Sequence, residues 1–118
     1  MTKILDLETR DGRIDIVDAE DRAYENPDSF EIPCVVQRHS LGEGDYAQVI
    51  FEFDAIEGFG GERLWLKVEK VSEMPGSYVG SISNDPIVCD LRFGDMVAFE
   101  ARHIIDILEE SSAKEIMG

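Results

Sequence analysis

Alternation of apolar and polar side chains in the middle of the chain constrains the fold more than any other feature of the sequence. The first alternating segment covers residues 46–53 and the second covers residues 64–71. Their apolar faces are formed by Ala47, Val49, Phe51 and Phe53 in the first segment and by Leu64, Leu66 and Val68 in the second. A side-chain period of two is typical of a strand with one buried face, so both segments are predicted to be half-buried β-strands.

Shorter extended segments follow at residues 77–83 and 95–100, and residues 104–108 are predicted to form a last short strand or turn. Gly58, Gly60 and Gly61 predict a long loop between the two alternating strands. Many short strands separated by turn residues favour a small curved all-β arrangement. We therefore predict an α+β domain that is mainly β: a strongly bent antiparallel sheet, or a partly open small barrel, of five to six strands.

The N-terminal third is predicted to add a hairpin and one or two short helices. Residues 1–17 form the opening hairpin, because Asp11-Gly12 supplies the positive φ of a tight turn. Asp18 is a suitable cap for a helix that begins at Ala19 and ends before Asn26-Pro27, and a second helical turn is expected over residues 34–40. These turns would cover one side of the sheet. The 118 residues are expected to form one domain, with a frayed or helical tail at residues 109–118.

One turn sequence occurs twice. Leu41, Gly44 and Asp45 recur 50 positions later as Leu91, Gly94 and Asp95, and a strand follows each time. Glycine permits a left-handed backbone, and the aspartate side chain can accept a hydrogen bond from the turn that precedes it. We interpret this as two uses of one strand entry rather than as a duplicated domain.

The charge balance limits the partners that the protein can have. The chain carries 11 Lys and Arg against 26 Asp and Glu, a formal net charge of −15. This field would repel phosphates, so no nucleic acid partner is expected, whereas a basic protein would be attracted. No apolar run is long enough to cross a membrane and no signal peptide is apparent, so no membrane partner and a cytoplasmic location are expected.

Metal and cofactor chemistry is not expected. Cys34 and Cys89 are interpreted as buried or free thiols, and His39 and His103 as surface side chains, because their spacing does not cluster four ligands. Residues 42–47 match the glycine pattern of dinucleotide sites, but the element predicted after them is a strand and not the helix that such a site requires. No nucleophile elbow and no base motif is present, which favours a protein that is not an enzyme.

The candidate binding residues are Arg63, Trp65, Lys67, Asn84 and Asp85. Alternation places Arg63, Trp65 and Lys67 on the face opposite to the apolar one. Trp65 there is either a platform for a ligand or the partly buried cover of a second small core. Asn84 and Asp85 belong to an Asn-Asp-Pro turn, whose residues are also explained by turn chemistry alone.

Several of these segments together resemble an uncharacterised family of small bacterial domains of unknown function. The motifs are the segments 26–30, 32–33, 41–45, 61–68, 83–86 and 93–95, with Phe99 and Ile104. The signature of that family is a G-E-R-x-W-x-x-V strand, an N-D-P turn and a G-D-x-V-x-F strand. The resemblance covers residues 27–107 and implies a bacterial cytosolic α+β module with no assigned activity.

Two classes of function follow from the sequence. The first is a non-enzymatic binding or protein-interaction module that acts on a cationic protein partner, and an immunity-like or nucleic-acid-mimicking acidic protein is a variant of it. The second is a small-molecule binder or enzyme with a cleft around Trp65, Arg63 and Asp85, in which arginine would hold an anionic group. A deep pocket at Trp65 would favour the second class, and a flat or convex acidic face would favour the first.

Overall fold

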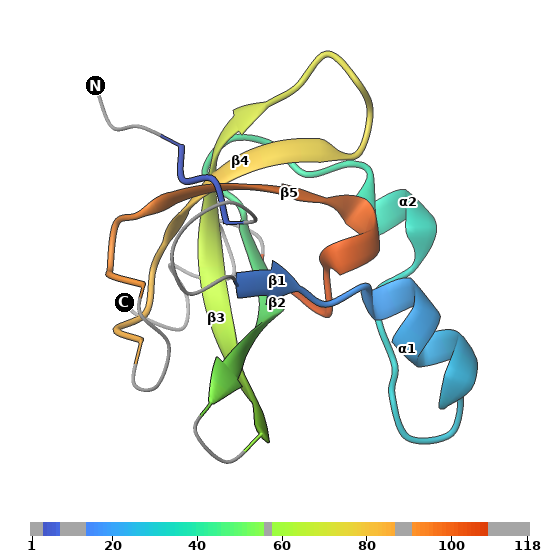
Figure 1. Ribbon diagram of the computed structural model, residues 1–118. Helices are drawn as coiled ribbons and strands as arrows, with labels where there is room; N and C mark the ends of the chain where they lie inside the picture. Colours follow the sequence, from blue (N-terminus) through green and yellow to red (C-terminus); the bar gives the residue numbers. More distant parts are fainter. Residues whose placement is uncertain (1–3, 8–13, 56–57, 87–90, 109–118) are drawn as a thin grey trace.

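The computed structural model describes residues 4–7, 14–55, 58–86 and 91–108, which form a strongly curved sheet with two short helices beside it (Figure 1). Its elements in chain order are β1 (Ile14–Ile16), α1 (Ala19–Glu25), α2 (Val35–Arg38), β2 (Tyr46–Ala55), β3 (Gly58–Val71), β4 (Ser77–Ile82), β5 (Met96–Glu100), the 3-10 helix η1 (Ala101–His103) and β6 (Asp106–Leu108). The strands and helices predicted from residue 14 onward are present, but β3 begins six residues before the predicted start at residue 64. In the described residues before β1, Ile4 forms an isolated bridge with Met96 and no strand of the predicted opening hairpin is found. No helix of the described residues is long and apolar enough to span a membrane.

The sheet is antiparallel and nearly closes into a barrel. The strand order is β1-β2-β3-β4-β5, and the edge of β2 that pairs with β1 also pairs with β6. Residues 4–7 lie between the two ends of this order: the backbone N–H of Leu5 donates to Met96 O at 2.8 Å, and that of Ile14 donates to Leu7 O at 3.1 Å. The prediction of a mainly β α+β fold with a bent sheet or a partly open small barrel is confirmed. The turn of the predicted opening hairpin and the predicted tail lie outside the described residues.

The prediction of a long loop at Gly58–Gly61 is wrong. β2 and β3 instead form one continuous hairpin, whose register runs from Tyr46↔Lys67 to Ala55↔Gly58. The three glycines lie within β3 because ladder hydrogen bonds are made by the backbone and do not need a side chain. Glycine weakens a strand without excluding it, so glycine content alone did not locate the end of this one.

The main core fills the inside of the curved sheet. Of the residues that alternation places inward in the two long strands, Ala47, Val49, Phe51, Leu64, Leu66 and Val68 are buried in one cluster and Phe53 packs against it partly buried. Val97 and Phe99 of β5, which the same alternation turns inward, are buried in this cluster too. Leu41 and Leu91, the leucines of the repeated turn, are buried in the same cluster. A second, smaller cluster lies on the outer face of β2, where Val17, Ala19, Ile50 and Ile105 are buried and Phe30 and Ile32 pack against them. The N-terminal helical segment therefore covers one part of the outer face, as predicted.

The repeated turn is built in the same way both times. Gly44 and Gly94 have φ angles of 95° and 89°, which only glycine adopts without strain. The carboxylate of Asp45 accepts the N–H of Gly42, and that of Asp95 accepts the N–H of Arg92, each at 2.8 Å. The prediction that one strand entry is used twice is confirmed.

Candidate functional site

Three of the predicted site residues form one row on the outer face of β3. Arg63, Trp65 and Lys67 point away from the core, which holds the even-numbered neighbours in this part of the strand. Trp65 lies opposite Gln48 of β2, and Lys67 lies opposite Tyr46 of β2 and Ser81 of β4. We call Arg63, Trp65 and Lys67 the β3 row.

Asn84 contacts the β3 row by a hydrogen bond to the backbone of Trp65. Its side-chain oxygen accepts the N–H of Trp65 at 2.6 Å, and the N–H of Ser83 donates to the carbonyl of Trp65 at 2.8 Å. These two bonds continue the β3–β4 ladder beyond Ile82, where β4 ends, so the backbone beneath Trp65 is held on that side. Asp85 is exposed in the same turn, and within the described residues it forms no hydrogen bond or ion pair. The structure thus joins Asn84 to Trp65 but does not join Asp85 to either.

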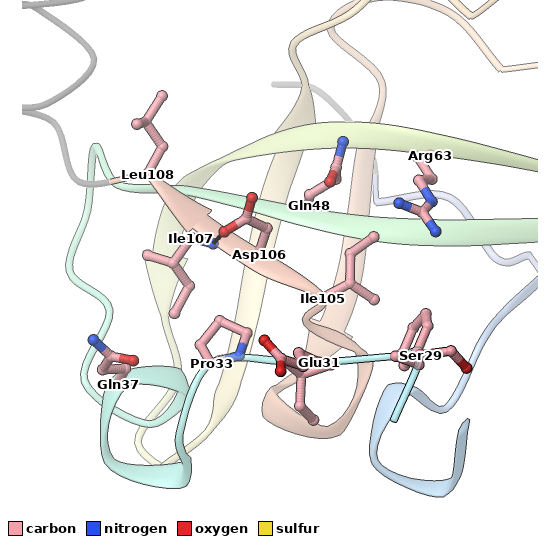
Figure 2. Close-up of a pocket in the computed structure, with 12 residues that line it drawn as sticks. Ser29, Glu31, Pro33, Gln37, Gln48, Arg63, Ile105, Asp106, Ile107 and Leu108 are labelled. Carbon is pink, nitrogen blue, oxygen red and sulfur yellow. Dashed lines mark hydrogen bonds between the residues drawn. The ribbon is translucent and has the colours of Figure 1, made fainter. Parts of the chain in front are cut away.

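A groove of about 760 Å³ lies beside the β3 row. Figure 2 shows Gln48 and Arg63 on the sheet strands at one side, residues 29–33 on the other, and residues 105–108 between them. Arg63 lines the groove, whereas Trp65 does not. The groove also contains two carboxylates, those of Glu31 and Asp106, and the latter accepts the N–H of Ile107 at 2.8 Å. The groove is therefore not the cleft around Trp65, Arg63 and Asp85 expected of a small-molecule binder or enzyme, because Arg63 lines it and the other two residues do not.

A second candidate surface is the helical segment beside the barrel. Residues 18–31 contain six carboxylates and a single cation, Arg22. Figure 1 shows α1 and the chain that follows it standing out to one side of the sheet. We call residues 18–31 the acidic arm.

Three ion pairs fix the acidic arm to the rest of the chain. Arg22 pairs with Glu52 of β2 at 2.8 Å. Asp18, the N-cap of α1, pairs with Arg102 of η1 at 3.0 Å. The third pair joins Glu20 to Arg38, the last residue of α2. The only cation of the arm, Arg22, therefore pairs with the sheet. The other two cations, Arg38 and Arg102, pair with Glu20 and Asp18 at the N-terminal end of α1, which we call the base of the arm.

The remaining carboxylates of the arm face solvent. Asp21, Glu25, Asp28 and Glu31 are exposed, and none forms an ion pair within the described part of the chain. Tyr24 stands among them with 88% of its surface exposed, the largest exposure among the exposed large hydrophobic residues of the described chain. An exposed aromatic side chain in a segment of exposed carboxylates that form no ion pair is suited to a cationic partner.

The base of the acidic arm holds three groups with shifted pKa values: Asp18, His103 and Arg102. Burial acts to lower the pKa of Arg102, but its hydrogen bonds to Asp18 and Glu100 raise it overall. Burial works against the charged form of Asp18, but hydrogen bonds from the Asp21 N–H and from Arg102 outweigh it and lower the pKa of this carboxyl. Burial and the nearby charge of Arg102 lower the pKa of His103 to about 4, although Glu100, Asp18 and Glu20 act in the opposite direction. Nδ1 of the neutral imidazole accepts the backbone N–H of Glu100 at 2.9 Å.

The stability of the fold is expected to fall as the pH decreases from 6.5 to 4. The unfolded chain binds a proton at His103 near pH 6.5, whereas the native chain does so only near pH 4. Between these values the unfolded state binds more protons, so the free energy of unfolding should decrease by up to about 1.4 kcal/mol per pH unit. Urea unfolding across this range measures the slope. In His103→Asn, which keeps an acceptor but does not titrate, the slope should be smaller, and equal slopes in the two proteins would contradict the assignment.

Cys34 is a free, exposed thiol at the N-cap of α2, which agrees with the interpretation as a free rather than a buried thiol, and Cys89 lies outside the described residues. His103 differs from its sequence interpretation. His103 is buried at 7% exposure and not a surface side chain, because η1 turns it beneath the acidic arm. The sequence contained the signal for the acidic arm, an excess of carboxylates over residues 18–31.

No protein-family model, curated protein or solved structure matches this chain. The resemblance of residues 27–107 to a family of small bacterial domains therefore stays a prediction. The case for a function rests on the geometry of the acidic arm and of the β3 row.

Proposed function

We propose that the protein is a non-enzymatic interaction module that binds a basic protein through its acidic arm. The observation that carries this proposal is the exposure of Tyr24, 88%, in a segment where Asp21, Glu25, Asp28 and Glu31 are also exposed and form no ion pair within the described residues. A lysine or arginine of a partner could pair with these carboxylates and lie against the tyrosine ring.

The anchoring of the arm supports this function. Ala19 is fully buried, and Phe30 and Ile32 pack on the same small cluster beneath the arm. The guanidinium of Arg22 also lies 5.9 Å from the centre of the Phe30 ring. A surface that is ordered before binding loses less conformational entropy when a partner docks, which leaves more of the contact energy for affinity.

The charge of the whole chain supports the same class of partner. A net charge of −15 attracts a basic protein from a distance and increases the rate of encounter. The specific contribution of the arm must therefore be separated from this general field by a variant of equal charge.

We expect a variant with three neutralised arm residues, Asp21→Asn, Glu25→Gln and Asp28→Asn, to lose its partner. The variant and the wild-type chain are used as bait in an extract of the source organism, and the dissociation constant of each captured basic protein is then measured. The arm variant should bind at least about tenfold more weakly than wild type, because it lacks the charges around Tyr24. Wild-type binding should also weaken steeply between low and high salt.

The matched control removes the same charge elsewhere. Glu43→Gln, Glu73→Gln and Asp85→Asn replace three exposed carboxylates that form no ion pair within the described residues. This variant should bind within about twofold of wild type, since only the general field is reduced. Equal losses in both variants would show that the arm is not the binding surface. Affinity that does not change with salt would show that the contacts are apolar and that the acidity only keeps the chain soluble.

A further inference from the structure

The β3 row is a cationic surface on a strongly acidic protein. Arg63 and Lys67 are exposed, and neither forms an ion pair within the described residues, although the chain has 26 carboxylates. Glu69, the next acidic residue along β3, accepts a hydrogen bond from Ser81 at 3.1 Å. On the side of β4, Lys67 lies opposite Ser81, which carries no charge. Among the described residues neither cation is paired, although Glu31 and Asp106 line the groove together with Arg63 and the Glu69 carboxylate is bonded to Ser81, opposite Lys67.

The row also has the geometry of a ligand platform. Side chains two residues apart on one face of a strand are separated by about 7 Å, so Trp65 has a cation at this distance on each side. Gln48 lies opposite Trp65 and supplies an amide from β2, and it lines the groove together with Arg63. The hydrogen bond from the Trp65 N–H to Asn84 holds the backbone beneath the ring.

We infer that the β3 row binds a small aromatic anion, whose ring stacks on Trp65 while its carboxylate or phosphate is held by Arg63 or Lys67. This site is distinct from the acidic arm and does not depend on the function proposed for it. Guanidinium groups bind carboxylates and phosphates through paired hydrogen bonds, and aromatic rings stack with an offset on indole. The occupant is a small anion rather than a nucleic acid, because the negative charge of the whole chain would repel a long polyanion. A single negative charge bound at the row is affected mainly by charges within the screening length of about 8 Å, which include Arg63 and Lys67.

Trp65 is the only tryptophan of the chain, so its fluorescence reports on the site directly. Iodide and caesium quench indole by collision, and their ratio measures the sign of the local potential. With each ion normalised to free N-acetyltryptophanamide at constant ionic strength, iodide is expected to quench Trp65 at least about twofold better than caesium. If the net charge of −15 alone determined the potential at Trp65, caesium would quench better than iodide.

The charge variants test whether the row causes this effect. Arg63→Gln and Lys67→Gln should each lower the ratio of iodide to caesium quenching. The control is Lys70→Gln, which changes the net charge equally but lies five positions from Trp65, beyond the register shift between Val68 and Lys70. It should leave the ratio unchanged. A caesium preference in the wild-type protein, or an equal effect of all three substitutions, would overturn the proposal.

The ring and its charge are tested with 4-nitrobenzoate, whose nitroaromatic ring quenches indole when it stacks. Quenching should saturate, and 4-nitrobenzamide, which has the same ring without the charge, should bind at least about tenfold more weakly. Arg63→Gln should weaken nitrobenzoate binding at least about fivefold, whereas Lys70→Gln should not. Quenching that rises linearly, or that is the same for the two compounds, would overturn the site. Neither result bears on the acidic arm.

Discussion

Replacing Phe51 by alanine is expected to lower the free energy of unfolding by about 3 to 5 kcal/mol. Phe51 is completely buried in the main core, in the part of β2 that is paired on both sides, with Ile16 of β1 and Glu62 of β3. Its ring contributes to the packing of the whole inner face, and the backbone ladder around it cannot collapse into the cavity that alanine leaves. Small domains have about 5 to 15 kcal/mol of stability in total, so this single change removes a large share.

Urea unfolding followed by circular dichroism measures the effect, and Phe93→Ala is the matched control. Phe93 is 65% exposed in the turn before β5, so its truncation should change the free energy of unfolding by less than about 0.5 kcal/mol. If both variants lost the same stability, the inward face of β2 would not be the centre of the core. A loss below about 1 kcal/mol in Phe51→Ala would have the same meaning.

The core could be predicted because a strand has an exact side-chain period of two. Once Val49 and Leu64 are assigned to the inner face, every second residue of each strand must follow, and a shift by one residue would turn the whole set to solvent. The same rule placed Arg63, Trp65 and Lys67 together on the outer face. Local turn chemistry was also predictable, since only glycine fits the positive φ of Gly44 and Gly94.

Contacts between distant segments left no such pattern. Residues 4–7 lie between β5 and β1, with a bridge between Ile4 and Met96 and a hydrogen bond from the N–H of Ile14 to Leu7 O, and nothing in the sequence of these segments specifies the contacts. His103 and Arg38 are buried although histidine and arginine are mostly surface residues, because tertiary partners supply their hydrogen bonds. Average preferences for burial therefore did not identify the two polar side chains that lie beneath the acidic arm.

Arg38 is the residue that joins the acidic arm to the barrel, and Arg38→Met is expected to lower the free energy of unfolding by about 2 to 4 kcal/mol. Arg38 is only 6% exposed. Its guanidinium donates hydrogen bonds to Pro33 O at 2.7 Å and to Ala101 O at 3.1 Å, in addition to its ion pair with Glu20. Methionine fills much of the space but leaves Pro33 O without a donor, which costs about 1 to 3 kcal/mol if that group stays buried. Ala101 O loses one of its two donors and keeps the N–H of Ile104 at 3.2 Å, so the loss of this second bond and of the pair with Glu20 adds a smaller cost.

Two variants separate the hydrogen bonds of Arg38 from its charge. Glu20→Gln should cost no more than about 1 kcal/mol, because the side chain of Glu20 is 44% exposed and an exposed partner contributes little. Arg38→Lys should fall between wild type and Arg38→Met, because an ammonium on a single stem cannot reproduce the planar fork that serves Pro33, Ala101 and Glu20. Equal losses in Glu20→Gln and Arg38→Met would show instead that the ion pair, and not the carbonyl contacts, determines the stability.

The same substitution links the fold to the proposed function. Arg38→Met leaves Asp21, Glu25, Asp28 and Tyr24 in place, but removes one of the three ion pairs that hold the acidic arm. Amide hydrogen exchange over α1 should therefore become faster, and the affinity for a basic partner should decrease by about threefold to tenfold as the arm loses its order before binding. An affinity equal to that of wild type, together with faster exchange, would show that the carboxylates bind their partner without being held in position by the barrel.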